Sequence, residues 1–236
     1  MRMESLTGLF FPARCPVCHD AVYPRDRLCC DECRPLLKYV TEPFCFKCGR
    51  PLFDPGAEFC TECIGTGHEF DAGRAVFLYD DVIKKSIYSF KYGNRQEYAK
   101  FYAKEMALAL GPFIERVRPD AIIPIPLHKS RLKKRGYNQA QLISEGLSKL
   151  VHIPVIKDLL IREKNTKVQK NLGEKARQNN LKNAFKIGRN DVSLKTVIIV
   201  DDIFTTGSTM DSAARCLREN GVANIFFAVL SIADMS

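Results

Sequence analysis

The chain has 236 residues, of which 46% are hydrophobic and 27% are charged, and its formal net charge is +9. This hydrophobic share supports a sizeable core and excludes a chain that is disordered throughout. No apolar run approaches the ~18 residues that cross a bilayer, so we do not expect an integral membrane protein. The first sixteen residues, MRMESLTGLFFPARCP, lack the apolar region and the cleavage site of a signal peptide, and we expect a cytoplasmic protein.

The positive charge is concentrated in one segment, residues 127–178. This segment holds thirteen Lys/Arg and four Asp/Glu, a difference equal to the net charge of the whole chain. Such a segment is typical of proteins that bind a polyanion, either a nucleic acid or a phosphate-rich small molecule. A lysine-rich surface that binds nothing is the alternative, and composition does not separate the two.

Nine of the ten cysteines lie before residue 64, in a pattern that repeats. Each repeat is a CxxC pair, eleven residues and a second CxxC pair: Cys15, Cys18, Cys30 and Cys33, then Cys45, Cys48, Cys60 and Cys63. Because a CxxC turn presents two thiolates to one ion, the pattern predicts two structural Zn²⁺ sites with four cysteine ligands each. An interleaved pairing of the four CxxC pairs is the alternative. Without a secretory signal, a disulfide framework is not expected.

Three residues close to these pairs or outside them need a separate assignment. Cys29 adjoins Cys30, but only Cys30 has the two-residue spacing to Cys33, so we predict Cys30 as the ligand. His19 is predicted to be a bystander beside a complete set of thiols. Cys216 lies in a helical pattern and is predicted to pack as a small apolar residue.

Strands and helices alternate beyond Gly65-Thr66-Gly67, which we interpret as a hinge between domains at residues 1–66 and 67–236. We predict strands at 73–80, 120–127, 155–161, 183–187, 196–202 and 223–233, and helices at 81–92, 98–111, 138–150 and 209–220, the second of which ends at Gly111-Pro112. Residues 128–136 are expected to form a polar loop, and residues 162–183 a long polar connection of the kind that acts as a lid. The result is an α/β fold with a mostly parallel sheet flanked by helices.

The segment TVIIVDDIFTTGSTM, residues 196–210, joins a buried strand to two carboxylates and a hydroxyl-rich turn. Backbone N–H groups at the following helix N-terminus favour an anion, and Gly207 allows it to approach closely. Asp201 and Asp202 beside a phosphate make sense when the ligand also has hydroxyls to donate, as a ribose 5-phosphate does. An ordinary turn with a Ser or Thr helix cap is the alternative. Neither GxxxxGK[ST] nor GxGxxG occurs in the chain.

Three segments resemble known families. VIIVDDIFTTGST matches the 5-phosphoribosyl-1-pyrophosphate (PRPP) signature of type I phosphoribosyltransferases. PIPLHKSRLKKRGYNQA is similar to the pyrophosphate-loop segment of the ComF family of competence proteins, and NTKVQKNLGEKARQNNLKNAF resembles the flexible loop of that family. Together with the predicted double zinc ribbon, the resemblance covers essentially the whole chain.

The resemblance implies a type I phosphoribosyltransferase fold with a small N-terminal zinc-ribbon module, and it implies a role for each motif residue. Asp201 and Asp202 would hold the ribose diol, and Mg²⁺ would arrive with PRPP. The 5′-phosphate would bind to Thr205, Thr206, Gly207, Ser208 and Thr209, and pyrophosphate to Leu127, His128 and Lys129 with Arg131 and Arg135. Lys164, Lys167 and Lys170 would close over the site as a lid.

The resemblance leaves three functions open. The first is Mg²⁺-dependent phosphoribosyl transfer from PRPP with release of pyrophosphate. The second is a PRPP sensor that binds single-stranded DNA or proteins of the competence machinery, and the third is a structural subunit that binds no PRPP. Phe204-Thr205 supplies no proton-transfer group where some relatives place a catalytic acid, so the reaction itself is not assigned.

Overall fold

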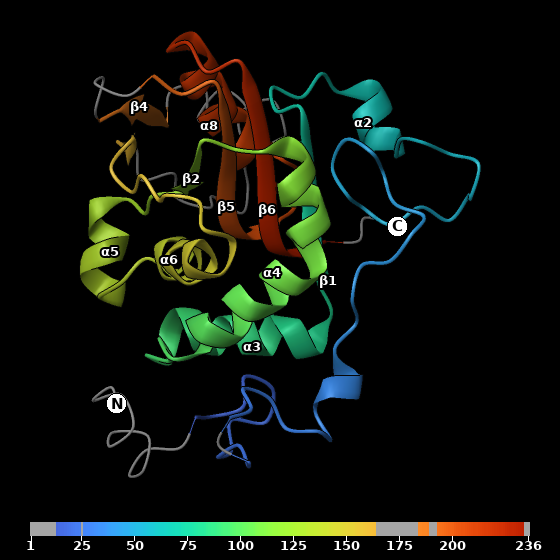
Figure 1. Cartoon of the computed structure of the whole chain (residues 1–236), viewed down its shortest axis with the longest axis vertical. Coiled ribbons are helices and arrows are strands. Elements are labelled where there is room, and N and C mark those ends of the chain that lie inside the picture. The colour runs from blue at the N-terminus through green and yellow to red at the C-terminus, as the bar shows by residue number, and fades with distance from the viewer. Residues whose placement is uncertain (1–12, 25, 164–183, 189–192, 234–236) are drawn as a thin grey trace, which may run out of the picture.

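The computed structural model describes residues 13–24, 26–163, 184–188 and 193–233, and its centre is a parallel sheet (Figure 1). The strands are β1 (Ala72–Leu78), β2 (Ala121–Pro124), β5 (Thr196–Phe204) and β6 (Asn224–Ile232). They lie in the order β1-β6-β5-β2, and all three pairings are parallel. Val155 extends the sheet by a single parallel bridge to Ile122 on β2. The prediction of a mostly parallel sheet is confirmed.

Helices cover both faces of this sheet. The front face in Figure 1 carries α3 (Asp81–Tyr92), α4 (Tyr98–Val117) and α6 (Gln139–Val151), and α8 (Ser208–Glu219) lies behind the sheet. Side chains alternate along β5, so Ile198 and Val200 join the core under α3, α4 and α6, while Val197 and Ile199 join the core under α8. The apolar residues of β5 are therefore divided between the cores of the two helix layers.

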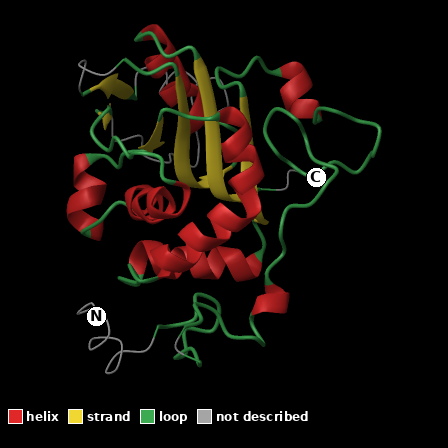
Figure 2. Cartoon of the chain, viewed as in Figure 1, coloured by secondary structure: helices red, strands yellow, loops and turns green. Residues whose placement is uncertain are grey.

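A short antiparallel pair of strands completes the α8 side. It consists of β3 (Leu160–Arg162) and β4 (Phe185–Ile187), drawn apart from the main sheet in Figure 2. The predicted strand at 155–161 is therefore wrong in extent, because only Val155 and residues 160–162 pair with another strand. The predicted lid residues Lys164, Lys167 and Lys170 lie outside the described residues.

Two other boundaries differ from the prediction. α4 continues past Gly111-Pro112 to Val117, because Phe113 and Ile114 bury their side chains and Pro112 removes only one hydrogen bond of the helix. The predicted loop at 128–136 contains the helix α5 (Lys129–Arg135). His128 caps it by accepting from the amide of Ser130 at 3.2 Å, and Gly136 ends it at φ +83°.

The cysteine-rich part has two short helices, η1 (Arg34–Leu36) and α2 (Thr61–Gly65). Its first half lies beneath α3 in Figure 1, where the His19 ring contacts the Tyr98 hydroxyl at 2.7 Å and Arg34 pairs with Glu105 at 2.9 Å. Tyr98, Phe101 and Tyr102 are buried in the core beneath α4. Among the described residues, no helix has the length and apolar character needed to cross a membrane.

Candidate functional site

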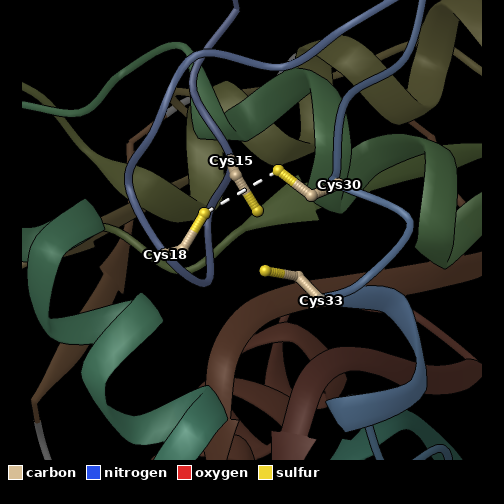
Figure 3. A group of neighbouring side chains, drawn as sticks. All are labelled: Cys15, Cys18, Cys30 and Cys33. Carbon is tan, nitrogen blue, oxygen red and sulfur yellow. Dashed lines mark hydrogen bonds between the residues drawn. The ribbon is translucent and has the colours of Figure 1, made fainter.

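The eight predicted ligand cysteines gather into two clusters. One holds Cys15, Cys18, Cys30 and Cys33, the other Cys45, Cys48, Cys60 and Cys63, and within each cluster all sulfur atoms lie within 4.8 Å of one another. Figure 3 shows the first cluster with its sulfur atoms around a common centre. The Sγ atoms of Cys18 and Cys30 are 3.7 Å apart, as are those of Cys48 and Cys60. Four thiolates at the Zn–S distance of a tetrahedral site are separated by about 3.8 Å, so both clusters fit Zn²⁺.

Cys29, His19 and Cys216, which were not predicted as metal ligands, have other surroundings. The Sγ of Cys29 lies 3.8 Å from that of Cys15, and this contact together with burial raises the pKa of the Cys29 thiol. A protonated Cys29 is suited to donate to the Cys15 sulfur rather than to bind metal. His19 contacts Tyr98 through one ring nitrogen and Ser89 through the other. Cys216 is buried in the core under α8.

The two aspartates lie on β5 and face opposite sides of the sheet, as successive strand residues do. Asp202 continues the face of Ile198 and Val200, toward α3, and its Oδ1 accepts from the Lys91 ammonium at 2.7 Å. Asp201 lies on the other face, where Arg162 of β3 acts on it electrostatically. Burial and the charge of Asp202 raise the pKa of Asp201 to about 7, against the opposing effect of Lys91. Lys91 thus contacts Asp202 directly, and the charge of Arg162 acts on Asp201 from the other face.

The turn after β5 leads into α8 without a side chain that caps the helix. Gly207 is the N-cap residue at φ +77°, and no side chain accepts from the first amides of the helix. This observation contradicts the alternative of a Ser or Thr cap. Thr205 and Thr206 are exposed, and the Thr206 hydroxyl donates to Ser208 at 3.2 Å. With its amides uncapped, the N-terminus of α8 has the arrangement of an anion site.

The predicted pyrophosphate segment follows β2 beside this turn. The amide of Ile125 donates to the carbonyl of Val200 at 2.9 Å, so residues 126–131 leave the sheet next to Asp201. Burial lowers the pKa of Arg162, and the positive charge of the nearby Arg131 lowers it further. Arg135 instead lies over the Tyr92 ring at 4.9 Å and hydrogen-bonds Gln139. Lys129 is exposed, and Leu127 and His128 are partly buried.

Four charged or titratable residues at this site were not predicted: Lys91, Arg162, Arg50 and His68. Arg50 donates to the carbonyl of Thr205 at 2.9 Å, and the ring of His68 contacts the Asp211 carboxylate at 3.0 Å. Arg50, His68 and Lys91 each contact a residue more than a hundred positions away, so no local pattern could have found these three.

A hollow of about 610 Å³ lies at the other end of the sheet. Ala72, Thr196 and Asn224, which begin β1, β5 and β6, contribute to its wall together with Phe113 and Arg74. In parallel sheets, ligands bind beyond the carboxyl ends of the strands. The candidate site is therefore the end that carries the two aspartates and the turn.

The chain matches the family model described as double zinc ribbon domain over residues 6–64, and that described as phosphoribosyl transferase domain over residues 133–234. It is 33% identical to "Competence protein F" of Haemophilus influenzae over 221 residues, which are 92% of this chain and 95% of that protein. The chain belongs to the ComF family. Its α/β part has the type I phosphoribosyltransferase fold, and its N-terminal part is a double zinc ribbon with two four-cysteine sites.

Two further proteins of similar sequence carry names that concern DNA or competence. "Competence protein ComFC" of Bacillus subtilis is 32% identical over 207 residues, 84% of this chain and 81% of that protein. "DNA utilization protein YhgH" of Shigella flexneri is 30% identical over 184 residues, 77% of this chain and 80% of that protein. The ComF-family assignment therefore rests on similarity over most of each chain.

Proposed function

We propose that the chain binds PRPP at the carboxyl end of β5 and, with Mg²⁺, transfers the phosphoribosyl group to an acceptor with release of pyrophosphate. The observation that carries this proposal is a pair of carboxylates near the end of β5, joined by a short turn to a helix N-terminus without a side-chain cap. Uncapped amides donate to a phosphate, and carboxylates accept from sugar hydroxyls. A ribose 5-phosphate offers both groups within the length of one turn.

The surrounding residues have separate roles in this proposal. Asp201 and Asp202 accept from the ribose hydroxyls, and the turn from Thr205 to Thr209 binds the 5′-phosphate. Pyrophosphate binds beside Leu127, His128 and Lys129, with Arg131 as a further cation. Arg135 is engaged with Tyr92 and Gln139, so its part in this site is secondary.

Transfer breaks the bond between ribose C1 and pyrophosphate and forms a bond from C1 to the acceptor nucleophile. Positive charge develops on the ribose ring, and in this proposal the negative charge of the two aspartates stabilises it. Mg²⁺ supplies neutralisation of the pyrophosphate charge. Phe204 and Thr205 hold no group that titrates near neutral pH, so the turn provides no general acid. The reaction suits an acceptor that is already a good nucleophile.

An acceptor screen tests transfer. The zinc-loaded protein is incubated with PRPP and Mg²⁺, with free nucleobases, single-stranded DNA or no acceptor, and pyrophosphate is measured. We expect release that depends on one acceptor class and disappears in Asp202→Ala. PRPP binding without release for any acceptor would contradict transfer and leave a PRPP-binding protein.

A second candidate function is that of a cytoplasmic accessory factor that binds single-stranded DNA, with or without protein partners of the competence machinery. Tyr88 and Tyr92 on α3 are 64% and 60% exposed, and their ring centroids are 4.9 Å apart. Arg135 lies over Tyr92, and the exposed Lys133 and Lys134 directly precede it on α5. Exposed aromatic rings beside cations are typical of surfaces on which unpaired bases stack. The names of the related proteins, which refer to competence and DNA utilization, support the same candidate.

Salt-dependent binding of an oligonucleotide tests this second function. We expect affinity to fall steeply with salt and to weaken when Lys133, Lys134 and Arg135 are changed to alanine, because phosphate contacts release counterions. Tyr88→Ala/Tyr92→Ala should weaken binding with little change in the salt slope, since stacking involves no phosphate. Phe53→Ala, which removes a ring that is 81% exposed elsewhere, is the control. Affinity independent of salt and of both groups would contradict this function.

A further inference from the structure

The second zinc ribbon contacts the turn after β5 through one buried side chain. Arg50 follows Cys48 by two residues, and its carbonyl accepts from the amide of Cys45 at 2.7 Å, so its backbone belongs to the second cysteine cluster. Its side chain is 7% exposed. One guanidinium nitrogen, Nη2, donates to the carbonyl of Thr205 at 2.9 Å, and the other, Nη1, pairs with Glu62 at 2.7 Å. Arg50 therefore joins this zinc cluster to the turn.

The hydrogen bond from Arg50 to the carbonyl of Thr205 also fixes the orientation of the next amide N–H. A trans peptide is planar, and its C=O and N–H point in opposite directions. When Arg50 holds the carbonyl of Thr205, the amide of Thr206 has to point to the other side. The orientation of one donor of the anion site is thus set by a side chain of the zinc ribbon.

The chain that leaves the second ribbon supports the turn at a second point. His68 stacks on Phe70 with ring centroids 4.6 Å apart, and its Nδ1 contacts Asp211 of α8 at 3.0 Å. A Cβ added to Gly207 would lie 3.1 Å from the His68 ring. The turn is therefore enclosed by the ribbon on the side of Thr205 and by His68 on the side of Gly207.

We propose that Arg50 is a positioning residue through which the second zinc ribbon sets the phosphate affinity of the turn. The inference rests on the proposed function of the turn as the 5′-phosphate site. Zn²⁺ fits the second cluster by its sulfur spacing, and with the metal bound the loop from Cys45 to Cys60 has one conformation that holds Arg50 in place. Among the residues that the structure describes, no such link joins the first cysteine cluster to the turn: His19 and Arg34, close to that cluster, hydrogen-bond residues of α3 and α4.

A binding titration on the full-length, zinc-loaded protein tests the affinity. PRPP and ribose 5-phosphate are titrated into the parent, Arg50→Ala, Arg50→Lys and Arg34→Ala. Loss of a charge-assisted hydrogen bond weakens binding by about 10-fold or more in Arg50→Ala, and Arg50→Lys recovers part of this loss. Arg34→Ala removes an arginine of the first ribbon while Tyr39 still donates to Glu105 at 2.6 Å, and it should bind as the parent does. Parent-like affinity in Arg50→Ala would overturn the proposal.

Amide hydrogen exchange tests the positioning without any ligand. Peptides that cover residues 203–210 should exchange faster in Arg50→Ala than in the parent, and also faster in Cys63→Ser, which disrupts the second cysteine cluster. In Cys18→Ser, which disrupts the first cluster, these peptides should exchange as they do in the parent. Unchanged exchange of these peptides in Arg50→Ala would refute the role of Arg50. Should the parent bind neither PRPP nor ribose 5-phosphate, the proposed function fails, while the exchange result still decides whether Arg50 and the second zinc hold the turn.

Discussion

At the scale of single residues, Lys91 partly neutralises the charge of the aspartate pair. Two adjacent carboxylates on a buried strand repel one another, and burial adds to the free energy of keeping both ionised. Lys91 contacts Asp202 at 2.7 Å, and its positive charge opposes the rise in the pKa of Asp201. A ligand that donates hydroxyls to Asp202 has to share this carboxylate with Lys91. The aspartates therefore form a site that is charged, partly neutralised and ready to accept hydrogen bonds.

Asp202→Ala should weaken PRPP binding by about 10- to 100-fold, because it removes a charge-assisted hydrogen bond of about 1.5–3 kcal/mol. Thr206→Ala removes one neutral donor among several and should cost about 1 kcal/mol, roughly 5-fold. Calorimetric titration of both variants measures the difference. A Thr206→Ala loss equal to or larger than that of Asp202→Ala would be inconsistent with the ribose-diol role.

The raised pKa of Asp201 predicts a pH dependence of stability. Asp201 titrates at about 7 in the folded chain and at about 3.9 when unfolded, so between these values the folded state binds more protons. The free energy of unfolding therefore decreases as pH rises through this window, by at most about 1.4 kcal/mol per pH unit from this group. Asp201→Asn should abolish this contribution. The free energy of unfolding of the variant, relative to that of the parent, should therefore be higher at pH 8 than at pH 5. Urea unfolding at both pH values checks it, and equal pH dependence of the two proteins would contradict it.

At the scale of elements, the unit from β5 through the turn to α8 could be predicted almost completely, since its hydrophobic pattern, carboxylates and Gly207 follow one another in the chain. The CxxC spacing likewise predicted both cysteine clusters, because a metal site imposes a local pattern. Helix α5 was missed because its seven residues have no apolar periodicity, and the end of α4 was misplaced because burial of Phe113 outweighed Pro112. Lys91, Arg50 and His68 reach the site only through tertiary packing, which a single sequence does not encode locally.

Gly207→Val should damage the turn more than any hydroxyl loss. Gly207 has φ +77°, which costs a residue with a side chain about 1–2 kcal/mol, and an added Cβ would lie 3.0 Å from the Phe204 ring. We expect a lower free energy of unfolding and a loss of PRPP binding comparable to that of Asp202→Ala. Gly111→Ala in α4, where a Cβ meets nothing within 4 Å, is the matched control and should gain about 0.5–1 kcal/mol. Parent-like binding by Gly207→Val would rule out close approach of a phosphate here.

At the scale of the whole molecule, the two zinc ribbons contact different layers of the α/β part. Cys15 and Cys33 pack into the core under α3 and α4, whereas Cys45, Cys48 and Cys60 pack into the core under α8. With four thiolates on each Zn²⁺, the formal net charge falls from +9 to about +5. The zinc ribbons are therefore not the source of the positive field, which belongs to the segment that contains α5.

The purified, reduced protein should contain two Zn²⁺ per chain, one in each cluster. Elemental analysis measures this number, and Cys18→Ser and Cys63→Ser should each lower it to about one. Chelation should then unfold the ribbons, since structural zinc contributes directly to their folding free energy. One zinc or none in the reduced parent would contradict the assignment of two four-cysteine sites.

The central claim is that the carboxyl end of β5 is a PRPP site, and a calorimetric titration of the zinc-loaded parent with PRPP, with and without Mg²⁺, tests it most directly. The geometry of the aspartates and of the uncapped turn predicts saturable binding of one PRPP per chain, tighter with Mg²⁺ and displaced by ribose 5-phosphate. No saturable binding in the presence of Mg²⁺, from protein that holds both zinc ions and unfolds cooperatively, would contradict it.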